Sequence, residues 1–309
     1  PAGDGDSVVV NGNANANAIT GSSSVDTLNG LGGADTLLGG ASGDTLDGGD
    51  GLDTASYAGS ASVVVTLGGS LRGGDAAGDT LVSIENLLGS SNADTLTGDG
   101  AVNVLDGADG DDTLKGGADS DTLIGNSGAD TASYAGSVGV TVDLAVLTGQ
   151  ASLGDASGDV LSGIENLIGS SNADALAGDG SANVLDGSGG DDTLTGAAGA
   201  DSLVGNSGAD TASYAGSAGV TVDLAVLVGQ TSGGDASGDV LSGIENLIGS
   251  AQADTLTGDG NVNVLTGGAG ADTLDGGADT DTADYSASGS GVTVELAAGT
   301  GLGGDAQGD

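Results

Sequence analysis

The sequence has no histidine and no cysteine, and its 309 residues include only one lysine, Lys115, and one arginine, Arg72. Without histidine or cysteine, the chain cannot form a Ser-His or Cys-His catalytic pair, a histidine-ligated zinc site or a disulfide. No apolar run approaches the roughly 20 residues that a membrane-spanning helix needs. We therefore expect no catalytic residues and no membrane span.

Acidic residues dominate the charged positions: 45 Asp and Glu give a formal net charge of −43. Self-repulsion on this scale opposes a compact state unless counter-ions bind at specific places. The same charge repels nucleic acid and anionic lipid, so cations are the expected partners. High charge with 66 glycines is also typical of disorder, but 37% of the residues are hydrophobic, and they recur at fixed positions.

The shorter repeat has a period of nine residues. In each turn an acid or amide is followed two residues later, in most cases, by leucine, and a glycine stands five residues before it. The four series are Asp26, Asp35, Asp44 and Asp53; Glu85, Asp94, Asn103, Asp112, Asp121 and Asp130; Glu165, Asp174, Asn183, Asp192, Asp201 and Asp210; and Glu245, Asp254, Asn263, Asp272 and Asp281.

The longer repeat is about 80 residues, because "IENLLGSSNADTLTGDG" at 84–100 returns in varied form at Ile164 and Ile244. It predicts a first block at 1–57, a connector plus a block at each of 58–137, 138–217 and 218–288, and the start of a further connector at 289–309. Asp79, Asp159, Asp239 and Asp309 are expected to begin turns of their own, since "GDASGDVL" resembles "GGASGDTL". We interpret the connectors as wider coils of one solenoid; beads on flexible linkers are the alternative.

Each nine-residue repeat has a Thr-Leu-x half with strand propensity and a glycine-rich half in which the backbone can turn sharply. Two repeats make one coil of 18 residues, and successive coils stack about 4.8 Å apart as parallel strands. The predicted fold is all-β, a parallel β-roll with leucines pointing inward. Asp35 then stacks on Asp53, and Asp112 stacks on Asp130.

Stacked carboxylates repel one another unless a cation lies between them. The glycine-rich turns also present carbonyl oxygens, and neither nitrogen nor sulfur ligands are available. Carboxylate and carbonyl oxygens together favour calcium, whereas magnesium demands a tighter octahedron and keeps its waters.

Turns such as "GGDGLDTAS" (48–56), "GADGDDTLK" (107–115) and "GGAGADTLD" (267–275) resemble the G-G-x-G-x-D-x-U-x repeat of RTX (repeats-in-toxin, haemolysin-type) proteins. The resemblance implies several calcium ions, held by the sixth-position Asp and by carbonyls of the glycine-rich turn. The carboxylates are Asp26, Asp35, Asp44, Asp53, Asp94, Asp112, Asp121, Asp130, Asp174, Asp192, Asp201, Asp210, Asp254, Asp272 and Asp281. The glycines are Gly48, Gly107, Gly116, Gly125, Gly196, Gly205, Gly267 and Gly276.

Some turns depart from this pattern. Asn103, Asn183 and Asn263 replace the aspartate, and turns headed "GSSNAD" or "GSAQAD" lose glycines, which puts calcium sites there in question. Four tyrosines, Tyr57, Tyr134, Tyr214 and Tyr285, each follow the last turn of a block. We expect them to be stacked or capping residues at the edge of the core, rather than a platform for a ligand.

Two functions fit this reading, both extracellular and both dependent on folding when calcium binds outside the cell. In the first, the array is a structural part of a bacterial surface protein, a surface layer or an adhesin stalk, where copies of the chain would be partners. In the second, it is the secretion and folding module of a larger enzyme or toxin. The regular 80-residue repeat favours the first, and the resemblance implies type I secretion for either.

Overall fold

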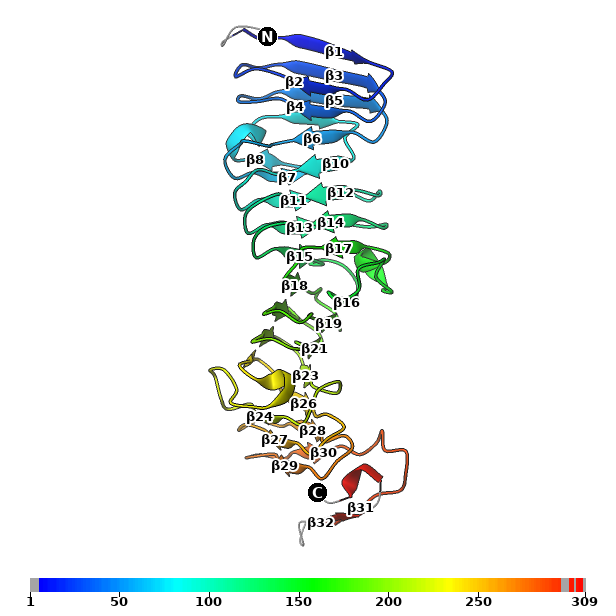
Figure 1. The fold of residues 1–309 in the computed structure, drawn as a ribbon, viewed down its shortest axis with the longest axis vertical. Helices are drawn as coiled ribbons and strands as arrows, with labels where there is room; N and C mark the ends of the chain where they lie inside the picture. The colour runs from blue at the N-terminus through cyan, green and yellow to red at the C-terminus, as the bar shows by residue number, and fades with distance from the viewer. Residues whose placement is uncertain (1–5, 296–299, 303, 308–309) are drawn as a thin grey trace. The chain divides into compact units, whose positions relative to one another are not determined.

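The computed structural model describes residues 6–295, 300–302 and 304–307 (Figure 1). The chain forms two compact units. Unit 1 comprises Pro1–Tyr134 and Val146–Ile164, and unit 2 comprises Ala135–Ala145 and Glu165–Asp309. The second connector is thereby divided between the units. The segmentation of about 80 residues stays a sequence-based prediction, as does the continuity of the connectors between units.

Unit 1 consists of short strands joined by tight turns and by 3-10 helices. These elements are β1 (Val9–Asn13), β2 (Ala18–Thr20), β3 (Thr27–Gly32), β4 (Thr36–Leu38), β5 (Thr45–Asp50), β6 (Thr54–Ser56), β7 (Val64–Thr66), β8 (Leu71–Arg72), η1 (Gly74–Ala76), β9 (Thr80–Val82), β10 (Asn86–Leu88), β11 (Thr95–Thr97), β12 (Val104–Asp106), β13 (Thr113–Lys115), β14 (Thr122–Ile124), β15 (Thr131–Ser133), η2 (Gly154–Ala156) and β17 (Val160–Ser162).

Unit 2 repeats the same design. Its elements are β16 (Thr141–Asp143), β18 (Asn166–Ile168), β19 (Ala175–Ala177), β20 (Val184–Asp186), β21 (Thr193–Thr195), β22 (Ser202–Val204), β23 (Thr211–Ser213), β24 (Thr221–Asp223), η3 (Gly234–Ala236), β25 (Val240–Ser242), β26 (Asn246–Ile248), β27 (Thr255–Thr257), β28 (Val264–Thr266), β29 (Thr273–Asp275), β30 (Thr282–Ala283), β31 (Thr293–Glu295), β32 (Thr300–Leu302) and η4 (Gly304–Ala306).

Within each unit the strands pair in parallel, and within the blocks the register joins residues 18 apart. Leu28 lies opposite Leu46 and Leu105 opposite Leu123. One stack of unit 1 runs β2-β4-β6-β10-β12-β14-β17, and one of unit 2 runs β16-β19-β21-β23-β26-β28-β30. Only the short pairs β7–β8 and β31–β32 are antiparallel among the described strands. The predicted parallel β-roll of two repeats per coil is confirmed (Figure 1).

The core is one line of apolar side chains per stack, because the middle residue of nearly every three-residue strand is buried. Leu96, Leu114 and Leu194, for example, are completely buried. Their flanking residues are half-exposed, in keeping with the alternation of side chains along a strand. So thin a core leaves the turns to supply much of the stability.

The second residue of each glycine-rich turn takes a left-handed backbone conformation. Gly49 and Gly117 have φ of 92° and 104°, and a Cβ on either would contact the backbone of the preceding coil. Ala108 and Asn126 adopt the same region, with φ of 74° and 71°, so glycine is not the only residue that fills this position.

The connectors add strands to the stacks in an order that differs from the chain order. In the first connector, β7 pairs with β11, which follows it, whereas the later strand β9 pairs with β5, which precedes the connector. The third connector repeats this arrangement, because β24 pairs with β27 and β25 pairs with β22. The expected turns of Asp79, Asp159 and Asp239 thus lead directly into β9, β17 and β25, while Asp309 lies outside the described residues.

The helices of the described chain are single 3-10 turns, so none has the length or the apolar run that crossing a membrane requires.

Candidate metal sites

The repeat aspartates form a ladder of side chain to backbone hydrogen bonds along the stacks. In each step, an Oδ1 atom accepts a backbone N–H of the preceding coil. The donor lies 18 residues earlier within a block, and 31 or 34 residues earlier where a connector intervenes, as for Asp94 and Asp174. The Asp35 N–H lies 2.7 Å from Asp53 Oδ1, and the Asp192 N–H lies 2.8 Å from Asp210 Oδ1. All but Asp281 of the predicted aspartates are buried. One oxygen of each ladder carboxylate is therefore bound by the fold itself, a role that the repeat pattern does not reveal.

The second oxygen separates the turns into classes. In ten turns the buried Oδ2 atom has no hydrogen-bond partner, and we call these the open turns. They are the turns of Asp35, Asp44, Asp53, Asp112, Asp121, Asp130, Asp192, Asp201, Asp210 and Asp272. A buried carboxylate oxygen without a donor is strongly unfavourable unless a proton or a cation compensates it.

Each open Oδ2 atom faces the glycine five residues earlier. A Cβ on Gly30 would overlap Asp35 Oδ2, and a Cβ on Gly125 would collide with Asp130 Oδ2 and with the carbonyl oxygen of Gly163. The bare glycine therefore makes room for an oxygen-lined space. Carbonyl oxygens from the next coil border it at the turns of Asp35, Asp53, Asp130 and Asp210.

The environment of the open turns favours the neutral carboxyl group in the absence of a cation. Burial, together with neighbouring carboxylates, raises the pKa of Asp112, Asp121 and Asp192 to about 7, although a backbone N–H opposes the shift in each case. Burial likewise raises the pKa of Asp201 to about 6. Protons thus occupy these sites more readily than they occupy an ordinary aspartate, as expected where a positive charge is lacking.

Four other turns satisfy both oxygens within the protein, and we call them the serine-headed turns: those of Asp26, Asp94, Asp174 and Asp254. In each, a serine four residues earlier donates its N–H to Oδ2, as from Ser170 to Asp174 at 2.6 Å. The serine hydroxyl donates to the same carboxylate as well, to Oδ1 at 3.0 Å in the Asp174 turn. Although burial opposes it, the N–H groups of Val8 and Ser22 lower the pKa of Asp26.

The asparagine turns also close without a cation. The Asn103 Oδ1 atom accepts the Asp99 N–H at 2.9 Å, and its Nδ2 group donates to the Glu85 carbonyl at 2.7 Å. Asn183 and Asn263 repeat both bonds. Glutamate takes the ladder position at the head of a block, where Glu85 Oε2 accepts the Asp53 N–H at 2.9 Å.

A tyrosine closes the aspartate that ends each connector. The hydroxyl groups of Tyr57, Tyr134 and Tyr214 donate to the second oxygen of Asp79, Asp159 and Asp239, and the last of these bonds is 3.0 Å long. These tyrosines are buried. They cap carboxylates at the core edge, which agrees with the expected capping role. In the first and third connectors a serine three residues after the tyrosine also accepts the N–H of Asp75 or Asp235.

The predicted ligands are thus distributed over several environments. Ten lie in open turns, four lie in serine-headed turns, and Asp281 is half-exposed with its carboxylate on the Asn263 N–H at 3.0 Å. Six of the predicted glycines place their carbonyl oxygens against the turn glycine of the preceding coil: Gly48, Gly107, Gly116, Gly196, Gly267 and Gly276. Gly125 and Gly205 instead leave space in their own turns, because a Cβ there would collide with Oδ2 of the aspartate five residues later.

Sequence reasoning missed the carbonyls of Ser83, Gly163 and Gly243. In the next coil, each lies where other coils have the carbonyl of a turn glycine. Their shared position before "IEN" is the signal that could have identified them. Nowhere in the described residues do three or more acidic side chains gather closely enough to hold one metal ion. An ion in an open turn must therefore take backbone carbonyls among its ligands, as calcium readily does.

A comparison with protein families supports this reading of the turns. The model of the RTX calcium-binding nonapeptide repeat (4 copies) matches residues 20–55, 83–114, 97–132, 159–194, 177–212, 239–265 and 248–283, which together cover more than half of the chain. A comparison with curated protein sequences finds no match.

Proposed function

Because the chain belongs to the family of RTX calcium-binding nonapeptide repeats, which bind multiple calcium ions, we propose that its open turns are the calcium sites. We further propose that the array is an extracellular structural part of a bacterial surface protein, and that it folds when calcium binds. The RTX repeat is a structural calcium-binding fold, and its turns here are built from aspartate, glycine and backbone carbonyls.

The observation that carries the calcium assignment is the set of ten buried Oδ2 atoms without a donor. The residues around them fit a hard cation, because carboxylate and carbonyl oxygens line the space and nitrogen and sulfur ligands are missing from the turns. A bound calcium ion supplies the positive charge that 45 acids and two basic residues cannot supply to one another.

The chain's own residues prepare this space. The ladder bond to Oδ1 fixes the carboxylate plane, so that Oδ2 points back into its own turn. The glycine five residues earlier leaves the room that a side chain would fill. The inward leucine anchors each strand, so a shift of the turn would have to move the core as well. Ion binding and folding are therefore coupled.

Asp192→Asn tests the assignment, with Asp191→Asn as the matched control. Asparagine at 192 can keep the Oδ1 acceptor for the Asp174 N–H, but it removes the charge at Oδ2. Asp191 is the adjacent, exposed acid, and its Oδ1 accepts the Ala209 N–H, a bond that asparagine can also keep. We expect Asp192→Asn to reduce the number of calcium ions bound in equilibrium dialysis, and Asp191→Asn to leave it unchanged. Equal losses would show that only overall charge matters.

Two features support the structural role. The 80-residue repeat brings the same tyrosine–aspartate bond back at 57, 134 and 214, and each connector adds strands to a stack. A chain that serves as a scaffold on the cell surface should resist protease there only while calcium is present. Protease treatment of intact producing cells, with and without chelator, checks this. Full digestion in both conditions, or protection in both, would contradict the proposal.

A further inference from the structure

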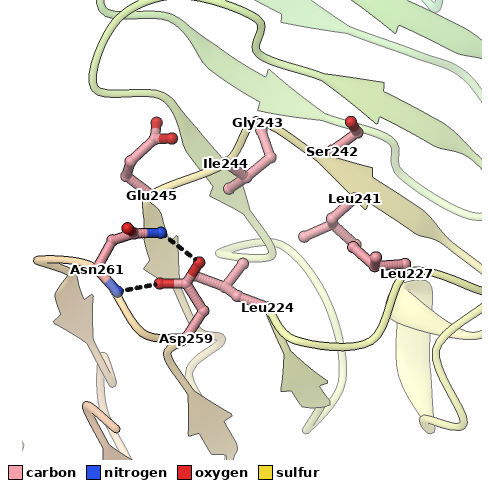
Figure 2. Close-up of a pocket in the computed structure, with 9 residues that line it drawn as sticks. All are labelled: Leu224, Leu227, Leu241, Ser242, Gly243, Ile244, Glu245, Asp259 and Asn261. Carbon is pink, nitrogen blue, oxygen red and sulfur yellow. Dashed lines mark hydrogen bonds between the residues drawn. The ribbon is translucent and has the colours of Figure 1, made fainter. Parts of the chain in front are cut away.

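A pocket of about 230 Å³ lies in unit 2, where the third connector meets the turns that follow it (Figure 2). Leu224 and Leu227 come from the connector loop after β24, and Leu241 comes from β25. Ile244 and Glu245 precede β26, whereas Asp259 follows β27. Glu245 touches the open turn of Asp210 through the Asp210 N–H, but none of these residues carries an unpartnered Oδ2 atom of an open turn, and the family match does not explain the hollow.

The pocket has an apolar half. Leu224, Leu241 and Ile244 are nearly buried, with 6%, 2% and 6% of their surfaces exposed, and they form a fixed floor. Leu227 is 76% exposed and continues this aliphatic surface outward. In Figure 2, Leu227 and Leu241 lie on one side, while Glu245, Asp259 and Asn261 lie on the other.

The other half is anionic and held in place by hydrogen bonds. Glu245 Oε2 accepts the Asp210 N–H at 2.9 Å, and both Asp259 oxygens accept bonds from Asn261 at 2.8 Å. These bonds orient the two carboxylates but bring no positive charge. The only basic residues of the chain, Arg72 and Lys115, both belong to unit 1, so unit 2 cannot neutralise the pocket itself.

The shape of the pocket decides between kinds of cation. A hard metal ion needs oxygen ligands around it, and four of the nine residues that line this pocket are leucine or isoleucine, whose side chains provide none. A volume of about 230 Å³ is below the roughly 300–1,000 Å³ of sites for drug-sized ligands, and it suits a single side chain. Lysine combines a four-carbon stem, which packs on apolar surface, with a compact ammonium group.

We propose that this pocket binds a lysine side chain of a basic partner polypeptide. The stem lies on Leu224, Leu227 and Ile244, and the ammonium group lies against the carboxylates of Glu245 and Asp259. The net charge of −43 favours approach of such a partner and makes the association dependent on ionic strength.

The test uses the full chain saturated with calcium and the blocked peptide Gly-Gly-Lys-Gly-Gly as the probe, followed by amide NMR shifts of unit 2. The same peptide with norleucine in place of lysine keeps the stem without its charge, and hexylamine keeps the charge without the peptide. We expect saturable binding of the lysine peptide, with shifts at Leu227, Glu245 and Asp259. The norleucine peptide should bind much more weakly, and hexylamine should bind no more tightly than the lysine peptide.

Two pairs of variants locate the site. Asp259→Asn should weaken binding of the lysine peptide up to about fivefold, as loss of an exposed ion pair does, whereas Asp275→Asn should not. Asp275 is the matched control, because it is an exposed acid of the same unit and its carboxylate also accepts the N–H two residues on. Leu227→Ser should likewise weaken binding, and Val228→Ser, at a neighbour 71% exposed, should not.

Absence of saturable binding would overturn the proposal, and so would equal binding of the lysine and norleucine peptides. Tighter binding of hexylamine than of the peptide would show that the pocket takes a free amine rather than a partner's side chain. If a variant and its control weakened binding of the lysine peptide equally, in either pair, the peptide would bind somewhere other than this pocket.

Discussion

Asp174 and Asp192 stand one coil apart in the same ladder, and they differ in the hydrogen bonds that their carboxylates accept within their own turns. In the serine-headed turn, the Ser170 N–H and hydroxyl bind the Asp174 carboxylate. In the open turn, Asp192 Oδ2 has no donor and faces the bare Gly187. The protein therefore supplies donors to both carboxylate oxygens of Asp174, but to only one oxygen of Asp192 in the next coil.

The difference shows that aspartate in this repeat has two separable tasks. Its Oδ1 atom joins successive coils through a backbone N–H: Asp174 Oδ1 accepts the Val140 N–H in the serine-headed turn, and Asp192 Oδ1 accepts the Asp174 N–H in the open turn. Its Oδ2 atom is closed by the protein in the serine-headed turns, and by calcium in our proposal for the open turns. The slope of unfolding free energy against the logarithm of calcium concentration separates the two, because it reports the ions released on unfolding.

Of the substitutions considered, that of a turn glycine should change the unfolding free energy of the chain most. A Cβ at Gly196 would overlap Asp201 Oδ2, so Gly196→Ala should cost about 1–3 kcal/mol through forced displacement and also lower the calcium slope. Gly180→Ala is the control, since nothing lies within 4 Å of a Cβ there, and its effect should stay within about 0.5 kcal/mol. Denaturant unfolding at several calcium concentrations measures both. Similar losses in the two variants would contradict a filled space at Gly196.

The pH dependence without calcium should follow the open turns. Burial raises the pKa of Asp112, Asp121 and Asp192 from 3.8 to about 7 in the folded chain, so folding favours their protonated forms. The stabilisation is therefore complete below about pH 4 and is lost as the pH rises through 7. In chelator, β-structure measured by circular dichroism should increase from pH 8 to pH 5. A decrease over that range would contradict the raised pKa values.

Removal of the tyrosine cap should destabilise the fold without changing its calcium dependence. Tyr214→Phe leaves the Asp239 Oδ2 atom without its hydroxyl donor, which should cost about 1–3 kcal/mol. The calcium slope should match that of the unmodified chain, because a side chain, not an ion, closes this carboxylate. Tyr57→Phe repeats the test in unit 1. A steeper slope in either variant would show that calcium replaces the missing hydroxyl.

The smallest expected effect is that of a serine-headed turn. Ser170→Ala removes the hydroxyl bonds to Asp174 and from the Asn172 N–H, but it keeps the backbone bond at 2.6 Å. The loss should be about 0.5–1.5 kcal/mol, again with an unchanged calcium slope. If Ser170→Ala flattens the slope as Asp192→Asn is expected to, the division of the turns into two classes is wrong.

Much of the fold could be predicted from the period of nine. A repeat that combines Thr-Leu with a glycine-rich turn has few ways to bury its leucine, and the stacking of Asp35 on Asp53 follows from two repeats per coil. The order of strands in the connectors could not be predicted. There, the earlier strand β7 pairs forward with β11, whereas the later strand β9 pairs back with β5, and the local sequence does not indicate this exchange of order.

The candidate site could be predicted only in part, because residue types do not specify where each oxygen points. The pattern identified the ladder aspartates, but the N–H donors to Oδ1 come from residues 18 or more positions away. The "GSSNAD" turns could have been recognised as closed by the protein, since a serine four residues before the aspartate can donate to its carboxylate. Nothing comparable linked Tyr214 to Asp239, which are 25 residues apart.

The most direct test of the account is calcium-dependent folding of the whole chain. At pH 8 the chain should be unfolded in excess chelator, because ten buried carboxylate oxygens then have no hydrogen-bond donor and the leucine core is too thin to offset their burial. Far-UV circular dichroism should show β-structure returning as calcium reaches about 10⁻⁴–10⁻³ M, the range of extracellular modules, and magnesium should restore it poorly. A β-spectrum that persists in chelator would contradict the central claim, and equal restoration by magnesium would contradict the choice of metal.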